Sequence, residues 1–225
     1  MSSALIHQLL GVAVVLTWLA LVMTTALQVR LRWPDQREWS RKVVHIGTGP
    51  VVLLAWWLGI SRDVALPAAL LVTLATALNH RFRLLPAVED VGRHSYGTIA
   101  YGASIAILLA LFWPQQPLAV AAGVLVMAIG DGMAGLLGPQ IRSPRWRLLG
   151  QNKSLGGTAA MAVGAALVLV LLQQIGQQAG IATPALPTLM LLALLATGLE
   201  QLSGFGIDNL SVPITTGWLW QSCSS

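Results

Sequence analysis

The sequence predicts an all-α, polytopic integral membrane protein with about seven transmembrane helices. The chain has 225 residues, of which 56% are hydrophobic and only 9% are charged, whereas a soluble domain carries about 25% charged residues. Its apolar residues form runs close to the ~20 residues that a helix needs to cross ~30 Å of hydrocarbon. Its basic residues gather between alternate runs, which membrane topology explains better than a nucleic-acid partner does. We expect a single transmembrane domain over 1–225.

Seven apolar runs predict the helices. In chain order they cover 5–29, 43–60, 64–79, 97–113, 117–138, 157–173 and 186–203. The first has no basic segment ahead of it and is too long for a signal peptide, so we expect a retained helix. The fourth and sixth are short and need tilt or extension to span a bilayer. A shorter apolar segment, 210–220, could re-enter the membrane or lie at its interface.

Turns and charge separate these helices and set their orientation. Trp113-Pro114 and Pro117 mark one turn, and the uncharged stretch 173–187, rich in Gln and Pro, forms another loop. Three other loops hold 12 of the 13 Lys and Arg residues: Arg30, Arg32, Arg37, Arg41 and Lys42; Arg81, Arg83 and Arg93; Arg142, Arg145, Arg147 and Lys153. The positive-inside rule places these loops in the cytoplasm or its equivalent. The N-terminus is then outside and, after seven spans, the C-terminus is inside.

One acid, Asp131, lies inside the fifth apolar run, between Gly130 and Gly132. A charge near the centre of a bilayer costs about 2.5–3.5 kcal/mol on insertion scales, so an acid in such a place usually belongs to a functional site. The two glycines remove neighbouring side chains and let a ligand or a second backbone come close. The alternative is a helix-packing seam whose Asp pairs with a basic neighbour.

Other polar side chains converge on the predicted inner side, where the second, sixth and seventh helices begin or end. They are Arg41, Lys42, His45, Asn152, Lys153, Ser154, Glu200, Asp208 and Asn209. Arg41 and Lys42 precede His45 by four and three residues, so the three share one helix face. The outer side is nearly free of charge. This asymmetry favours a reaction or binding event at the inner face over a transport path.

Residue type predicts the chemistry at this face. Asp131, Glu200 and Asp208 are hard oxygen ligands without matching His or Cys partners, and such ligands suit Mg²⁺. The glycine-rich stretch 151–158 opens a helix, where backbone N–H groups and the Lys153 ammonium make an anion site. The stretch lacks the Walker A order of residues, and Ser, Gly and Thr also start ordinary helices. Together the acids and the Lys-Gly turn indicate a nucleoside triphosphate with its metal. His45 is either a general base or a ligand for phosphate or lipid headgroups.

At these residues the chain resembles the polyprenol kinases, a family that includes dolichol kinase and the phytol kinases of plants and cyanobacteria. Four blocks carry the resemblance, in order over about residues 41–213: Arg41-Lys42-x-x-His45; Gly130-Asp131-Gly132-x-Ala134 with Gly138; Asn152-Lys153-Ser154-x-x-Gly157; and Glu200 with Asp208-Asn209-x-Ser211-Val212-Pro213. The stretch Gly92-Arg93-His94-Ser95-Tyr96-Gly97-Thr98 is similar to the phytol kinase branch.

The resemblance implies CTP-dependent transfer of a phosphoryl group to a membrane isoprenoid alcohol, with Mg²⁺, at the cytoplasmic or stromal face. The alcohol would be phytol or a related prenol, phosphorylated toward tocopherol or phylloquinone synthesis after chlorophyll breakdown. Asp131, Glu200 and Asp208 would hold the metal, and Asp131, Lys153 and His45 would be catalytic. The positions implied to contact the nucleotide are Gly130, Gly132, Asn152, Ser154, Gly156, Gly157, Arg41 and Lys42.

Two positions depart from the family pattern: Gly135 and Ile207 stand where the family often has further acids. The nearest rival is a CTP:phosphatidate cytidylyltransferase, which has a similar Gly-Asp block and a Ser-x-Lys-Thr-x-x-x-Gly stretch. The Arg-Lys-x-x-His start and the Asp-Asn-x-Ser-Val-Pro end argue against it. A non-enzymatic membrane transporter or assembly protein is the alternative of a different class.

Overall fold

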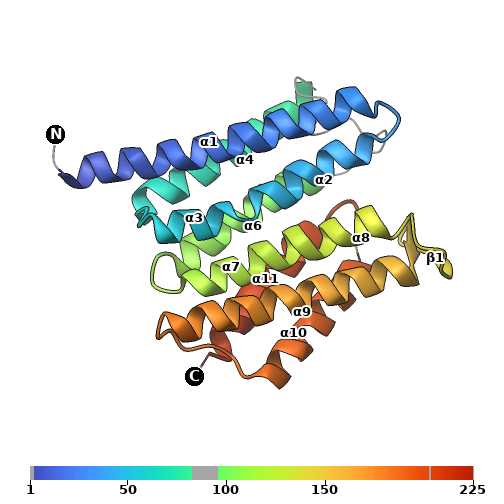
Figure 1. The fold of residues 1–225 in the computed structure, drawn as a ribbon. Coiled ribbons are helices and arrows are strands. Elements are labelled where there is room, and N and C mark those ends of the chain that lie inside the picture. Colours follow the sequence, from blue (N-terminus) through green and yellow to red (C-terminus); the bar gives the residue numbers. More distant parts are fainter. Residues whose placement is uncertain (1–2, 83–95, 203, 225) are drawn as a thin grey trace.

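The computed structural model of the chain describes residues 3–82, 96–202 and 204–224. Its helices are rods that run between the two ends of one bundle, with a short β-hairpin beyond one of these ends (Figure 1). We call that end the hairpin end. In chain order the elements are α1 (Ser3–Arg32), α2 (Arg37–Thr48), α3 (Val51–Trp57), α4 (Arg62–Phe82), α6 (Gly97–Phe112), α7 (Pro117–Leu125), the π-helical η1 (Val126–Asp131), α8 (Gly132–Leu137), β1 (Arg145–Leu148), β2 (Gln151–Ser154), α9 (Leu155–Gln178), α10 (Leu186–Gln201) and α11 (Asp208–Ser222).

Four helices in these described ranges are long and apolar enough to cross a membrane: α1, α4, α9 and the continuous rod Pro117–Leu137. With 30 residues, α1 is about 45 Å long at 1.5 Å per residue, which exceeds the ~30 Å of hydrocarbon. Large apolar side chains such as Leu10 on α1 and Leu71 on α4 are exposed. The outer surface of the bundle is therefore one that lipid chains would cover, as expected of a membrane protein.

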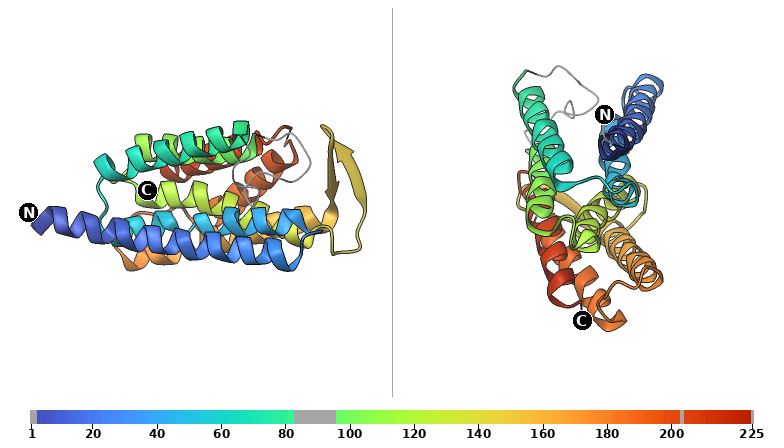
Figure 2. Two further views of the ribbon diagram at one scale, coloured as in Figure 1. Left: turned by 90° about the horizontal axis from the view of Figure 1, so that it is seen from above. Right: turned by 90° about the vertical axis from the view of Figure 1, so that its left-hand side faces the viewer.

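The rod formed by α7, η1 and α8 lies at the centre of the bundle, as the end-on view in Figure 2 shows. Every residue of α7 is buried. The rod contacts α2, α3, α6, α9 and α11. It approaches α11 so closely that a methyl group at Gly123 would collide with the backbone carbonyl of Pro213. Small residues permit such contacts between helices where hydrophobic burial from water gives no driving force.

Some predicted helix boundaries are wrong. The second predicted helix, 43–60, is two helices, α2 and α3, which meet at Gly49-Pro50. The first of them begins earlier than predicted, at Arg37. Proline lacks an N–H and clashes with the preceding turn, so the helix is interrupted there. The sixth helix is longer than the run 157–173 that predicted it, since α9 covers Leu155–Gln178.

The C-terminal segment packs into the bundle as a further helix. Instead of lying at an interface, α11 packs along α7 and α6 and buries Trp220 and Thr216. It returns the chain to the end of the bundle from which α1 starts (Figures 1 and 2). In the described part of the chain α11 thus adds an eighth rod to the bundle, and the number of membrane spans and their orientation stay predictions.

The hairpin corrects the all-α prediction. β1 and β2 are antiparallel, with Arg145 opposite Ser154 and Leu148 opposite Gln151. The turn between them has positive φ at both central residues, Leu149 at 48° and Gly150 at 80°. Two-residue turns of this kind match the twist of paired strands.

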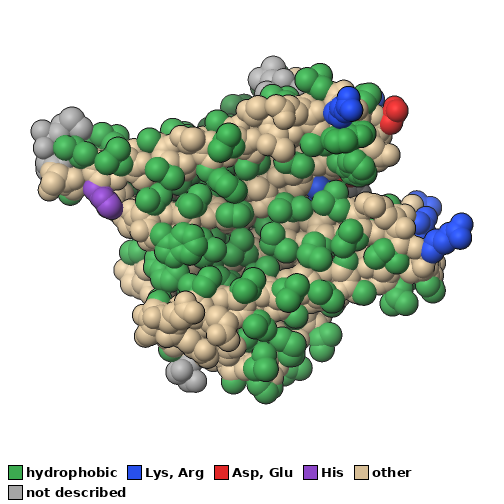
Figure 3. Space-filling view, viewed as in Figure 1, with side chains coloured by type: hydrophobic (Ala, Val, Ile, Leu, Met, Phe, Trp, Pro, Cys, Tyr) green, Lys and Arg blue, Asp and Glu red, His purple; other side chains and the backbone are tan. Residues whose placement is uncertain are grey.

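Charge is distributed along the bundle as predicted. Lys and Arg side chains gather at the hairpin end, whereas hydrophobic side chains cover the length of the rods (Figure 3). At the opposite end, Arg62 donates a hydrogen bond to the Ala110 carbonyl. Arg83, Arg93, His94 and the stretch 92–95 lie outside the described residues.

Candidate active site

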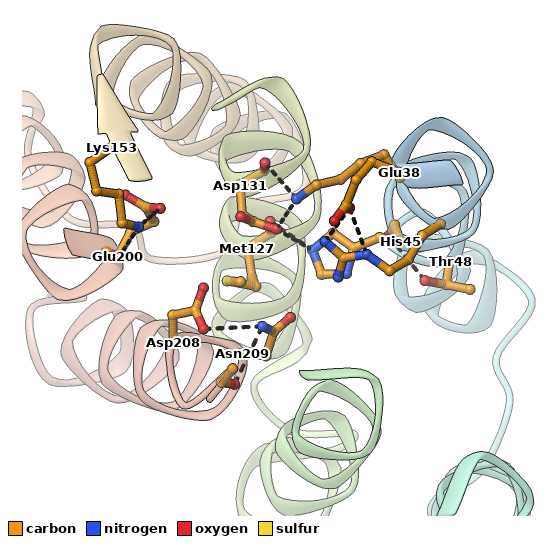
Figure 4. Close-up of polar contacts among 12 residues, drawn as sticks. Glu38, His45, Thr48, Met127, Asp131, Lys153, Glu200, Asp208 and Asn209 are labelled. Atoms are coloured by element: carbon orange, nitrogen blue, oxygen red, sulfur yellow. Dashed lines mark hydrogen bonds and ion pairs between the residues drawn. The ribbon is translucent and has the colours of Figure 1, made fainter. Parts of the chain in front are cut away.

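Three carboxylates from three separate helices meet at the hairpin end. Asp131 ends η1, Glu200 is near the end of α10, and Asp208 begins α11. One oxygen from each lies within 4.8 Å of the others, and Figure 4 shows the three side chains around a common space. They line a cavity of about 400 Å³. The acids predicted from the sequence as one group are thus brought together by the fold.

The backbone at Asp131 is unusual. The rod changes from α-helix to π-helix over Val126–Asp131 and back to α-helix at Gly132. A π-turn carries an extra residue per turn, which alters the direction of the side chains that follow it, and such turns are frequent at functional sites. The hydropathy of this segment does not predict this feature.

Gly130 and Gly132 allow close helix packing, and their contact with the nucleotide stays a prediction. A methyl group at Gly130 would collide with Met161 of α9, and one at Gly132 with Ile46 of α2. Neither glycine lines the cavity. They allow two neighbouring helices to approach the rod on either side of Asp131.

Two of the acids are paired with lysines. The Lys42 ammonium donates to Asp131 Oδ2 at 2.5 Å and to the Asp131 carbonyl at 3.0 Å. The Lys153 ammonium donates to Glu200 Oε1 and to the Glu200 carbonyl, the latter at 2.8 Å. Lys42 is 4% exposed and Glu200 6%. The alternative considered for Asp131, a helix-packing contact in which the acid pairs with a base, is therefore present together with the acid cluster.

Asp208 has no lysine partner of this kind among the described residues. It accepts a hydrogen bond from Asn209 Nδ2 at 3.2 Å. Asp208 lies at the start of α11 and is buried, so its charge and those of Asp131 and Glu200 repel one another at close range. An added positive charge between these acids would relieve that repulsion.

The arrangement fits a divalent cation with oxygen ligands. Oxygens on opposite sides of an octahedral Mg²⁺ are about 4 Å apart, since each ligand lies 2.0–2.1 Å from the ion. A separation within 4.8 Å needs only small side-chain movements to reach this. Beside Glu200, the buried Oε1 of Gln201 has no hydrogen-bond partner in the described part of the chain. The Gln201 amide nitrogen donates to Glu200 Oε2 at 2.8 Å, so Gln201 orients one of the acids.

His45 lies behind Asp131 and does not line the cavity. Its Nε2 is 3.3 Å from Asp131 Oδ2 and 3.2 Å from the Met127 carbonyl. Its ring packs against Tyr101 with the centroids 4.4 Å apart. Through these contacts His45 holds Asp131 in place, and its role as a general base or a phosphate ligand stays a prediction.

The glycine-rich stretch forms strand β2 and the first turn of α9. Ser154 caps α9, with its Oγ accepting the Gly157 N–H at 3.1 Å. The Gly156 N–H donates to Ser143 Oγ at 3.0 Å, and Gly156 does not line the cavity. Two of the backbone N–H groups in the predicted anion site are therefore bonded within the protein. Asn152, Ser154 and Gly157 do line the cavity, as predicted.

Sequence reasoning placed Arg41 at the site but missed several of its neighbours. Arg41 lines the cavity and donates through Nε and Nη2 to Glu38 Oε2, at 2.9 and 2.8 Å. The cavity residues not predicted from the sequence include Glu38, Arg145 and Gln201. Arg145 is part of a basic loop that the sequence explained by membrane topology, and nothing in the periodicity distinguishes it from Arg142 or Arg147.

Comparison with known proteins gives related sequences but no related structure. The chain is 38% identical to the phytol kinase of Synechocystis sp. over 206 residues, which cover 91% of this chain and 88% of that protein. It is 28% identical to a probable chloroplastic phytol kinase of Triticum aestivum, over 80% of this chain and 66% of that one. It is 29% identical to a chloroplastic farnesol kinase of Arabidopsis thaliana, over 58% of this chain and 46% of that protein. No family model matches the chain, and no solved structure matches it.

Proposed function

The chain belongs to the polyprenol kinase family, in the branch of the cyanobacterial phytol kinases, and we propose that it transfers the γ-phosphate of CTP to phytol or a related prenol, with Mg²⁺. The family predicted from the sequence is confirmed, and the chain is a kinase that phosphorylates a prenol alcohol. The choice of CTP, the metal and the side of the membrane are our proposal.

The observation that carries this proposal is the meeting of Asp131, Glu200 and Asp208 within 4.8 Å on the wall of a polar cavity. Phosphoryl transfer asks a protein mainly to position its substrates and to offset the charge on the transferred group. The three acids would hold Mg²⁺. When bound, this ion would supply a positive charge that orients the phosphates. Lys42 and Lys153 lie against two of these acids, within reach of phosphates held there.

The reaction forms a bond between the alcohol oxygen and the γ-phosphorus and breaks the bond from that phosphorus to CDP. The proton of the alcohol must leave as the new bond forms. A carboxylate of the cluster receives it, since His45 lies behind Asp131 and outside the cavity wall. The products are CDP and a prenyl monophosphate.

The alcohol would approach along the apolar side of the cavity mouth. Phe205 and Ile207 are 76% and 57% exposed, and they alternate with Gly206 and Asp208, which line the cavity. An isoprenoid tail can remain in lipid beside these side chains while its hydroxyl reaches the acids. We place this mouth on the cytoplasmic or stromal face, because the basic loops gather at the same end.

A direct assay tests the proposal. The purified protein in lipid nanodiscs would be given γ-labelled CTP, ATP or GTP with phytol, geranylgeraniol or a long polyprenol, with Mg²⁺ or with excess EDTA. We expect label on the lipid with CTP and Mg²⁺ and none with EDTA. Release of pyrophosphate with a CDP-lipid product would show a cytidylyltransferase and overturn the proposal. A preference for ATP would overturn the choice of nucleotide.

A further inference from the structure

The cavity wall carries four acids and four bases in the described part of the chain. The bases are Arg41, Lys42, Arg145 and Lys153. Three of them are held by acids of the same wall: Arg41 by Glu38, Lys42 by Asp131 and Lys153 by Glu200. Arg145 differs from these three. Its only hydrogen bond to the described residues runs from Nη2 to the Pro139 carbonyl, at 3.2 Å.

The backbone of Arg145 is held firmly beside the helix that opens the site. Arg145 begins β1 opposite Ser154, and directly opposed residues of an antiparallel pair project from the same face. Ser154 itself lines the cavity and caps α9. The chain is also tied on the other side of Arg145, because the Leu155 N–H donates to the Pro144 carbonyl at 3.0 Å. The guanidinium is thus presented to the cavity from a fixed strand, with its side chain exposed.

We infer that Arg145 binds the phosphate chain of the incoming nucleoside triphosphate, an inference that rests on the proposed function. A guanidinium carries five N–H donors in a planar fork that matches phosphate oxygens. One of these donors is used by Pro139, and Arg145 forms no ion pair with an acid among the described residues. The lysines must leave their carboxylates before they can bind phosphate fully. Arg145 needs no such exchange, so it binds the nucleotide before the lysines move.

This role predicts an effect on nucleotide affinity and little effect on the alcohol. Loss of a charged hydrogen-bonded contact raises Kd by roughly 10- to 100-fold. We expect Arg145→Gln to raise Kd for CTP in the presence of Mg²⁺ by that factor. Arg145→Lys keeps the charge but lacks the planar fork of donors. Its Kd for CTP should lie between those of Arg145→Gln and the unmodified protein. KM for the prenol should change by less than about twofold, since uniform loss of nucleotide binding leaves the other substrate unaffected.

The test is an equilibrium titration of the full-length protein in nanodiscs with CTP and, separately, with inorganic tripolyphosphate. Arg142→Gln is the matched control, because Arg142 lies in the same loop, is exposed, and does not line the cavity. We expect Arg145→Gln to weaken both ligands and Arg142→Gln to weaken neither by more than about twofold.

Two results would overturn the inference. In the first, Arg145→Gln binds CTP as the Arg142→Gln control does. In the second, Arg145→Gln loses affinity for CTP but keeps its affinity for tripolyphosphate, which would move the contact from the phosphates to the ribose or base. Failure of the proposed function would be distinguishable. An unmodified protein that binds CTP through Arg145 but phosphorylates no prenol would refute the activity and leave the phosphate contact in place.

Discussion

Replacing Asp131 by Asn tests the centre of the site, because it removes one charge from a buried ion pair and one ligand from the acid cluster. The Lys42 ammonium is 2.5 Å from Asp131 Oδ2, and the two side chains are 4% and 15% exposed. In Asp131→Asn the ammonium would remain buried without its carboxylate. We therefore expect two separate losses, one in stability and one in activity.

The size of the stability loss follows from this geometry. Two unit charges at the distance between Lys42 and Asp131 attract each other by about 7 kcal/mol at an effective dielectric constant of about 20. The cost of desolvation must be subtracted from this value. Breaking a buried pair by removing one partner costs about 3–5 kcal/mol. Since Asp131 is partly exposed, we expect the lower value, about 3 kcal/mol. This lowers Tm by roughly 6–12 °C for a chain of this size.

Thermal unfolding in detergent and the phosphotransfer assay measure the two losses. We expect no measurable turnover from Asp131→Asn, although the protein still inserts. Adding Lys42→Met to Asp131→Asn should recover most of the lost stability, because a pair removed as a whole leaves no buried charge, but should recover no activity. Asp63→Asn is the matched control, since Asp63 is exposed in the first turn of α4, at the end of the bundle opposite the hairpin end. Near-normal turnover in Asp131→Asn would show that the site is misplaced, and a double variant as unstable as the single one would refute the buried pair.

Three further predictions test neighbouring features. Lys153→Ala should abolish transfer in the prenol assay while the protein still inserts, because the Lys153 ammonium lies against Glu200; near-normal turnover would contradict this. Gly135→Ala should lower turnover about tenfold or more, which corresponds to about 1.4 kcal/mol, and should lower Tm as well, since its methyl group would displace the end of Lys42 from Asp131 in a buried pair. Gly198→Ala, which faces open space, is its control and should leave turnover unchanged. A protease site fused to each terminus should be cut from the same side of sealed vesicles, because α11 ends at the end of the bundle from which α1 starts; cleavage from opposite sides would refute the position of α11.

The convergence of the acids could be predicted because it depends on helix ends and charge. The basic loops fix which helix ends share one side, and Asp131, Glu200 and Asp208 all fall near those ends. Helical periodicity likewise placed Lys42 and His45 on one face, and both contact Asp131 in the structure. These inferences need only sequence spacing and topology.

The features that sequence reasoning missed depend on contacts between distant segments. α11 is a 15-residue helix that contains Asp208, Asn209 and Pro213, so its hydropathy is that of a peripheral segment. One face of α11 is nevertheless buried, because Gly123 and Gly217 allow close approach between α11 and α7. The hairpin lacks the usual Asn-Gly turn signal, and its strands are fixed partly by the Ser154 cap of α9. Such pairings cannot be read from periodicity.

The two acids that this chain lacks relative to the family pattern are not needed to complete the cluster. At Gly135 the space beside the backbone is filled by the end of Lys42, which pairs with Asp131. Ile207 is exposed, whereas the next residue, Asp208, is buried and lines the cavity. Each of three helices therefore still contributes one carboxylate, and Mg²⁺ commonly takes only one or two from the protein and completes its shell with water and phosphate oxygens. A further acid at position 135 would compete with Asp131 for Lys42, so its absence is consistent with a site in which that lysine keeps a single partner until the nucleotide arrives.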